Sequence, residues 1–122
     1  MSVNKVILIG NATQPEIKTV GGAKLASFRI ATTERFKDRG GENRENTEWH
    51  TISAWRTAAD IVEKYVAKGS QVYIEGKLHT REWQDQSGAK RYTTEIVVDS
   101  IQLLGKRTDN GGGRRQENDT DF

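Results

Sequence analysis

Two tryptophans six residues apart, Trp49 and Trp55, are the side chains of this sequence best suited to contact a ligand. Alternate residues of a strand face the same side, so both rings share a face with Thr51 and Ser53. The rise of a strand would place the two Cα atoms roughly 20 Å apart. Only small hydroxyl side chains stand between the rings, whereas a core strand would turn its rings inward and its hydroxyls outward. The pattern predicts a stacking platform for the bases of a stretched single nucleic-acid strand.

The opposite face of this segment carries His50, Ile52 and Ala54, which suits packing. A packing role is therefore predicted for His50 rather than a ligand role. The alternatives for the two rings are structural: Trp49 could pack under a loop, and Trp55 could cap one end of the core.

Two further rings, Phe36 and Trp83, lie in polar segments that offer little to bury them. Stacking contributes about 1–3 kcal/mol per base and accepts any base. Lys and Arg add phosphate contacts that are sensitive to salt and blind to sequence. Such cations flank the rings at Arg35, Lys37, Arg56 and Arg81.

Enzymatic patterns are missing from the sequence. HExxH, CxxC, P-loop and nucleophile-elbow motifs do not occur, and His50 and His79 belong to separate predicted strands. No cysteine is present, which excludes disulfides and thiolate metal sites and fits a reducing cytoplasm. We predict no catalytic residue, no metal, no cofactor and no small-molecule substrate.

Length and charge limit the possibilities further. A chain of 122 residues suits one compact domain, and no apolar run is long enough for a transmembrane helix. The first residues lack the layout of a signal peptide. Residues 1–107 hold 17 Lys and Arg against 13 Asp and Glu, whereas residues 108–122 hold two against four. A mildly basic body suits a polyanionic partner, although many inert domains are equally basic.

The body reads mainly as β-strands separated by glycine-containing turns. Five strands are predicted, over residues 3–10, 25–33, 47–56, 70–78 and 92–104. Residues 36–46 (FKDRGGENREN) are polar and contain glycine, which predicts an exposed loop. Residues 79–91 are also polar, and the turn signal DQSG at 85–88 predicts a protruding hairpin.

One helix is predicted over residues 57–68, between the third and fourth strands. Thr57 and Asp60 form a capping-box-like pair at its start, and Gly69 ends it. Its apolar stripe is expected to face the core and consists of Ala58, Ile61, Val62, Tyr65 and Val66. The inward residues of the following strand are expected to be Val72, Ile74 and Leu78.

Three strands, one helix and two strands are the layout of an OB-fold, an all-β five-stranded Greek-key barrel that binds oligonucleotides. A small sandwich and an SH3-like barrel are the alternatives, and the single helix favours the OB-fold. We predict this domain over residues 1–105. Residues 106–122 include the run NGGGRR and cannot bury a core, so a disordered linker and tip are predicted there.

Several segments resemble the bacterial single-stranded DNA-binding protein family. They are NKVILIGN (4–11), TEWH (47–50), KGSQVYIEG (68–76), DQSG (85–88) and RYTTE (91–95). They occur in the right order and together thread residues 1–105. The resemblance implies an OB-fold homotetramer that wraps single-stranded DNA without sequence preference during replication, recombination and repair.

The resemblance also implies which residues contact DNA. The family's stacking aromatics fall at Phe36, Trp49, Trp55 and Trp83; Phe36 stands where the best-known members have tryptophan, and Trp55 where they have phenylalanine. The remaining residues of the predicted interface are Tyr73, Lys5, Arg35, Lys37, Arg56, Lys77, Arg81 and Arg91. His50 matches a position at the subunit contact. Weaker local binding is implied at positions where members often carry a basic residue, namely His79, Glu82 and Thr51.

The C-terminal end resembles the family in outline. Family members close with an acidic tip ending in Pro-Phe, which docks on replication and repair proteins. Here the corresponding residues are Glu117, Asp119, Asp121 and Phe122, with Asp121 in place of the proline. A partner-docking tip is therefore expected, and a solvated end is the alternative. The short linker makes a plasmid, phage or specialised paralogue an alternative to the main chromosomal protein.

The prediction is thus a non-enzymatic, sequence-independent single-stranded DNA-binding protein of the cytoplasm, associated with the nucleoid. One alternative is a primosome-type OB-fold, a dimer whose surface serves protein assembly. The other is an RNA-binding or nuclease OB protein.

Overall fold

The computed structural model describes residues 1–106, so the predicted linker and tip lie outside the described residues except for Lys106, the last residue of β6. The elements in chain order are β1 (Val6–Ala12), β2 (Glu16–Val20), β3 (Ala23–Lys37), β4 (Asn43–Trp55), α1 (Thr57–Tyr65), β5 (Ser70–Gln84) and β6 (Lys90–Lys106). Six strands therefore stand where five were predicted. The additional strand is β2.

β1 and β2 are two halves of one barrel strand. Both pair with β3, β1 at Asn11 and Ala12 and β2 along its whole length. The break falls at residues 13–15, where Pro15 has no N–H to donate to a ladder. No apolar alternation marks β2, because only Ile17 of its residues packs against the core. Counted as one strand, β1 and β2 restore the five strands of the predicted OB-fold.

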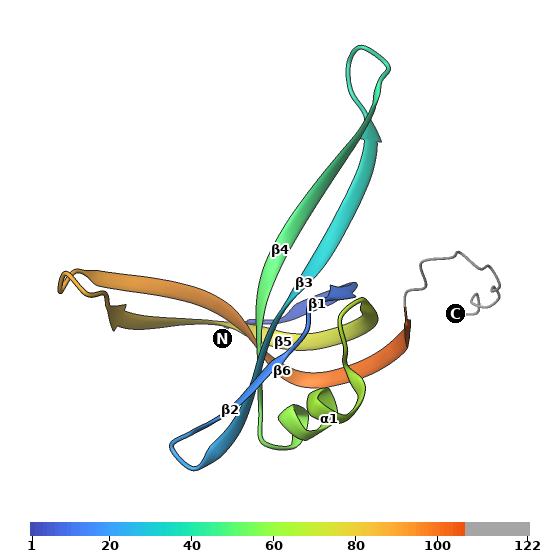
Figure 1. The fold of residues 1–122 in the computed structure, drawn as a ribbon. Coiled ribbons are helices and arrows are strands. Elements are labelled where there is room, and N and C mark those ends of the chain that lie inside the picture. The colour runs from blue at the N-terminus through green and yellow to red at the C-terminus, as the bar shows by residue number, and fades with distance from the viewer. Residues whose placement is uncertain (107–122) are drawn as a thin grey trace.

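The strands close into a barrel (Figure 1). Their order is β1-β5-β6-β4-β3-β2, and the β1–β3 pairing joins the two ends. All neighbours are antiparallel except β4 and β6, which pair in parallel at Ile52–Ile96 and Ser53–Val97. The predicted closed barrel, with one helix between its third and fourth strands, is confirmed.

The core lies inside this barrel, with α1 against one end. The largest fully buried side chains are Ile30, Ile52, Ile74, Val62 and Val72. α1 contacts β3, β4 and β6 and buries Ala59 and Val62. Burying a branched aliphatic side chain contributes about 1.5–3 kcal/mol, so these few residues hold the barrel closed.

Two long hairpins leave the barrel in different directions (Figure 1). We call residues 33–47 the β3–β4 arm and residues 77–94 the β5–β6 arm. The predicted loop over residues 36–46 is wrong, because β3 and β4 stay paired from Leu25–Trp55 out to Lys37–Asn43. Both faces of the ribbon meet solvent, so its strands carry no apolar alternation that could have revealed them. The second predicted hairpin is confirmed, with β5 and β6 paired out to Gln84–Lys90.

Four local expectations also need correction. The helix ends at Tyr65 rather than at residue 68, and Tyr65 is exposed instead of buried in the core. Leu78 is exposed as well, because β5 has already left the barrel at that point. The predicted Thr57–Asp60 cap does not form: the residue before the helix is Arg56, without a side-chain cap, and Asp60 pairs with Lys24 at 2.9 Å.

Candidate nucleic-acid interface

The tryptophan segment forms β4, and its two rings differ in exposure. Trp49 is 54% exposed, whereas Trp55 is half-buried opposite Leu25 of β3. Thr51 is exposed, but Ser53 is buried between its neighbours Ser27 and Val97. The platform is therefore open at its Trp49 end and partly closed at its Trp55 end.

Arg29 lies at the open end of the platform, although no sequence pattern had singled it out as a candidate. Its guanidinium carbon lies over the Trp49 ring, 5.3 Å from the centroid. Arg29 stands opposite Thr51 on β3 and forms no ion pair within residues 1–106. Its charge is therefore free to meet a phosphate beside a stacked base. Arg29 is exposed on β3, and only the β3–β4 register brings it to Trp49.

Phe36 and Trp83 stand on the two arms, 46% and 42% exposed. Phe36 belongs to β3 rather than to a loop, and Trp83 belongs to β5. The indole N–H of Trp83 donates to the Thr93 hydroxyl of β6 at 2.9 Å, which holds the ring against its arm. Both rings remain open enough to accept a base.

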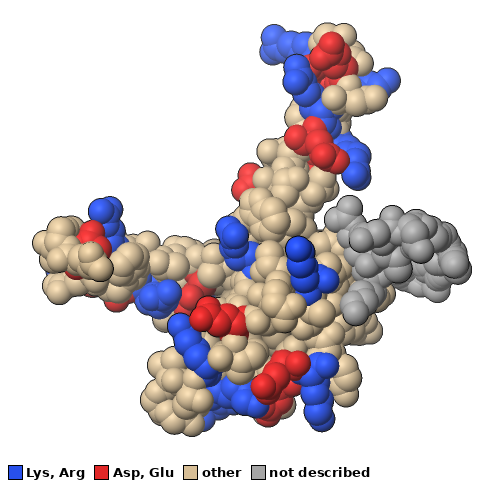
Figure 2. Space-filling model, in the orientation of Figure 1, with Lys and Arg blue, Asp and Glu red and all other residues tan. Residues whose placement is uncertain are grey.

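The predicted cations fall into two groups. Four are ion-paired: Lys5 with Glu75 (3.2 Å), Arg35 with Glu45 (2.9 Å), Arg81 with Glu95 (3.4 Å) and Arg91 with Asp85 (2.9 Å). Among residues 1–106, Lys37, Arg56 and Lys77 form no ion pair. On the face shown in Figure 2, Lys and Arg of the β3–β4 arm alternate with Asp and Glu. A pair whose two partners are exposed, such as Arg35–Glu45, contributes only about 0–1 kcal/mol, so a phosphate can replace the carboxylate at small cost. The Arg81–Glu95 pair differs, because Glu95 is buried.

Lys5 and Tyr73 gather around Glu75 and away from the tryptophans. The Tyr73 hydroxyl donates to one Glu75 oxygen at 2.6 Å, and the Lys5 ammonium donates to the other at 3.2 Å. The Tyr73 hydroxyl, followed by Lys5, lowers the pKa of Glu75. β6 lies between β5 and β4, so the barrel does not bring these residues beside Trp49.

Arg56 occupies the turn between Trp55 and α1 in an unusual conformation. Its φ of 58° and ψ of −117° make it the one non-glycine residue of positive φ in the described chain. Its N–H donates to the Lys24 carbonyl at 2.9 Å, and its carbonyl accepts from Asp60 at 3.0 Å. Lys24 also contacts Glu63 at 2.6 Å, and that bond chiefly raises the pKa of Lys24. Strain of this kind persists where surrounding contacts impose it, commonly at functional sites.

The two histidines have structural neighbours. His50 is half-buried, with Nε2 2.9 Å from the Thr32 hydroxyl, which agrees with its predicted packing. His79 lies 3.7 Å from the buried Glu95. Residues 1–106 contain no cluster of three metal-ligating side chains and no helix long and apolar enough to cross a membrane.

Residues 3–104 match the Single-strand binding protein family, which covers nearly the whole described barrel and both arms. The chain belongs to this family. Membership confirms the predicted class, a single-stranded DNA-binding protein without enzymatic function, and rules out the nuclease alternative.

Named relatives of the family agree with this assignment. A single-stranded DNA-binding protein of Rhizobium meliloti is 50% identical over 120 residues, covering 92% of this chain and 69% of the relative. Single-stranded DNA-binding protein 1 of Chlorobaculum tepidum is 50% identical over 114 residues, covering 91% and 70%. A solved Plasmodium falciparum SSB complex with ssDNA superposes with a TM-score of 0.77 at 37% identity, covering 85% of this chain and 97% of that one.

Proposed function

We propose that the chain binds single-stranded DNA independently of sequence, by stacking bases on Phe36, Trp49, Trp55 and Trp83. The observation that carries this proposal is the Arg29–Trp49 pair at the open end of the β4 platform, with a further exposed ring on each arm. Every base has a π-face, so such rings do not select among bases. Holding strands unpaired in this way protects them during replication, recombination and repair, at the nucleoid in the cytoplasm.

Tryptophan fluorescence tests the stacking directly. Adding poly-dT should quench the emission of Trp49, Trp55 and Trp83, and affinity should fall as salt rises. Unchanged emission at stoichiometric oligonucleotide would contradict the proposal. Competition with RNA homopolymers distinguishes the RNA-binding alternative, since preferential displacement by RNA would favour it.

Phosphate contacts are assigned to the cations of the interface. The unpaired group, Lys37, Arg56 and Lys77 together with Arg29, is expected to bind phosphate without first breaking an ion pair. The paired residues Arg35, Arg81 and Arg91 would exchange a carboxylate for a phosphate or share the two. Replacing Lys77 by alanine should therefore weaken binding more than replacing Arg35, measured at one fixed salt concentration.

We also propose a homotetramer. Ile7 and Ile9 of β1 are 57% and 51% exposed, and residues 6–10 pair with β5 on one side only among the described residues. A free strand edge beside exposed apolar side chains suits pairing with another copy. Tyr73 and Glu75 stand opposite these two isoleucines, so we expect Tyr73 and Lys5 to contribute less to DNA binding than the arms do. His50 is proposed at a subunit contact from the family resemblance.

Native mass with and without a long oligo-dT tests the assembly. Four chains are expected, and a variant carrying Glu at positions 7 and 9 should dissociate. A dimer in both conditions would favour the primosome-type alternative.

The acidic tip is proposed to recruit replication and repair proteins through Glu117, Asp119, Asp121 and Phe122. The support is its composition: three carboxylates and a terminal aromatic that suit a basic, apolar pocket. Deleting residues 117–122 should abolish binding to a helicase or exonuclease partner and leave oligo-dT affinity intact. Unchanged partner binding would favour the alternative, in which the tip is only a solvated end.

A further inference from the structure

Both arms end in the same turn, although their sequences otherwise differ. Residues 38–44 read DRGGENR and residues 85–91 read DQSGAKR, so each follows the pattern Asp-X-X-Gly-X-X-Arg. The glycine adopts a positive φ in both, 82° at Gly41 and 87° at Gly88. In each turn this glycine donates its N–H to the aspartate carbonyl at 3.0 Å.

One aspartate holds each turn together. Oδ1 of Asp38 accepts the backbone N–H of Gly40 (2.9 Å) and Glu42 (3.0 Å). Oδ1 of Asp85 accepts those of Ser87 (2.9 Å) and Ala89 (3.1 Å). The Asp is half-buried in each turn, whereas the other five residues before the Arg are exposed.

The second carboxylate oxygen fixes the arginine. Nε of Arg44 donates to Oδ2 of Asp38 at 2.8 Å, and Nε of Arg91 donates to Oδ2 of Asp85 at 2.9 Å. An arginine has five N–H donors, so four remain for other acceptors. Arg44 also lies 3.7 Å from Glu42, a neighbour that Arg91 lacks.

An aromatic ring stands directly across the ribbon from each arginine. Phe36 is opposite Arg44, and Trp83 is opposite Arg91. Directly opposed residues of antiparallel strands have their side chains on one face, about 5 Å apart at Cβ. Ring, aspartate and arginine therefore occupy equivalent places on two arms that are far apart in the sequence.

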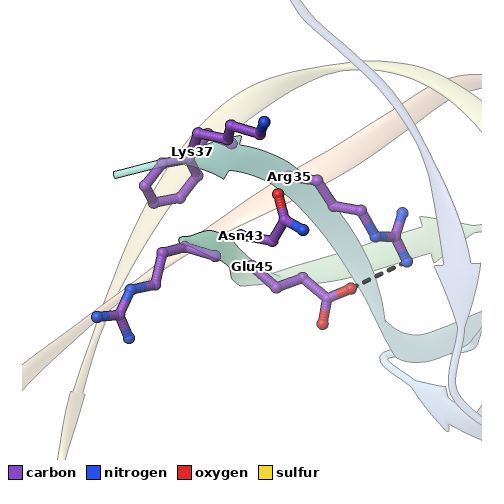
Figure 3. A pocket seen from close by; sticks show the side chains of 6 residues that line it. Arg35, Lys37, Asn43 and Glu45 are labelled. Carbon is purple, nitrogen blue, oxygen red and sulfur yellow. Dashed lines mark ion pairs between the residues drawn. The ribbon is translucent and has the colours of Figure 1, made fainter. Parts of the chain in front are cut away.

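A hollow lies at this point of the β3–β4 arm (Figure 3). It has a volume of about 670 Å³ and is lined by three consecutive cross-strand pairs: Lys37–Asn43, Phe36–Arg44 and Arg35–Glu45. Phe36 and Arg44 thus border one space that combines an apolar wall with free N–H donors. A base with its phosphate has this mixed chemistry.

We propose that the two arm tips are two copies of one nucleotide-binding unit, in which the ring stacks the base and the arginine opposite it binds the adjoining phosphate. Asp38 and Asp85 are positioning residues, because they act by holding the arginine beside the ring. This inference rests on the proposed function and adds Arg44, Asp38 and Asp85 to the interface.

A turn exchange tests the equivalence. Only four substitutions, R39Q, G40S, E42A and N43K, convert the first turn into the second. This variant should bind a short labelled oligo-dT as tightly as the unchanged chain. Arg44→Ala should weaken binding by about fivefold, as expected for loss of an exposed ion pair, and lower the salt slope by about 0.7. Loss of binding in the exchanged chain, with its fold retained by circular dichroism, would overturn the equivalence.

The second turn provides the test of positioning. Arg91→Ala should lower the affinity and the salt slope like Arg44→Ala, whereas Lys90→Ala, one residue away and already 3.6 Å from Glu82, should change them less. Asp85→Asn keeps the oxygen that accepts the turn N–H groups but replaces the oxygen that accepts from Arg91. It should therefore weaken binding when Arg91 is present and have no effect in the Arg91→Ala background. Tighter binding by Asp85→Asn would overturn the positioning role. Unchanged affinity and unchanged salt slope in both arginine variants would overturn the proposal of two nucleotide-binding units. Failure of the unchanged chain to bind oligo-dT would instead refute the proposed function.

Discussion

The barrel and the arms are built from the same strands but are stabilised differently. In β5 buried residues alternate with exposed or half-buried ones from Ser70 to Gly76, and every residue from position 77 to 84 is exposed. β3 changes in the same way, from alternation near Ala23 to full exposure after residue 32. The first halves are held by burial of apolar side chains, and the second halves by cross-strand pairs such as Thr33–Thr47 and Thr80–Thr94.

This difference separates stability from binding along single strands. Side chains inside the barrel cannot touch DNA, and those on the arms bury too little to hold the fold. Substitutions in the two regions should therefore affect different measurements. Trp49, Trp55 and Arg56 belong to the predicted interface but lie on the barrel rather than on an arm, so they test how sharp that division is.

The largest expected effect is on the stability of the barrel. Ile74→Ala removes a fully buried side chain and should lower the free energy of unfolding by about 2–5 kcal/mol. Leu78→Ala, four residues along the same strand and 51% exposed, is the matched control and should cost far less. Urea denaturation measures both. Equal losses would mean that the arm stabilises the fold as much as the core does, which would contradict the proposed difference between barrel and arms.

Trp55→Ala should affect both regions. Losing a stacking ring weakens oligo-dT binding by about 1–3 kcal/mol, and the half-buried position adds a loss of stability smaller than that of Ile74→Ala. Trp49→Ala is the control, because this more exposed ring should lose comparable affinity with less stability. Fluorescence titration and thermal melting report the two quantities. Full stability of the Trp55 variant would mean that this half-buried ring contributes nothing to the barrel and serves binding alone.

Arg56→Gly should stabilise the protein, whereas most substitutions destabilise it. Glycine adopts a positive φ without strain, so the free energy of unfolding should rise by about 1 kcal/mol. Oligo-dT affinity should fall, because an unpaired cation next to Trp55 is lost. Arg56→Ala separates the two effects: it removes the charge, keeps the strain and should not gain stability. A stability gain in the alanine variant would show that the backbone is not the cause.

The smallest effect is local and depends on pH. Arg44 chiefly lowers the pKa of Asp38, and the Ser87 hydroxyl followed by Arg91 lowers that of Asp85. Because each folded pKa lies below the usual 3.8, the ionised carboxylates stabilise the turns above pH 3.8, and this contribution is lost as the pH falls through the lowered values. The protection of the Gly41 and Gly88 amides from hydrogen exchange, relative to unstructured amides at the same pH, should fall below that pH while the barrel amides stay protected. Asp→Asn variants should lose this dependence, and barrel amides that open together with the turns would contradict it.

The sequence by itself determined the family and the barrel, and it predicted which rings stack on bases. Alternation in the segments of β4 and β5 inside the barrel predicted Ile52, Val72 and Ile74 as inward residues, because one face of each strand is buried. The order of strands and helix then indicated the OB-fold. The tip of the β5–β6 arm was also predictable, since its turn residues have local conformational preferences.

Only the tertiary structure decided what lies beside what. Pairing of β3 with β4 continues into residues 36–46, whose polar composition predicted a loop, because hydrogen bonds between strands need no apolar pattern. That register brings Arg29 to Trp49 and Arg44 to Phe36, residues whose separation in sequence gives no hint of contact. The exposure of Tyr65 and Leu78 was likewise set by where the barrel ends, a boundary that local sequence does not encode. Residue types predicted the chemistry of the interface, and strand pairing assembled it.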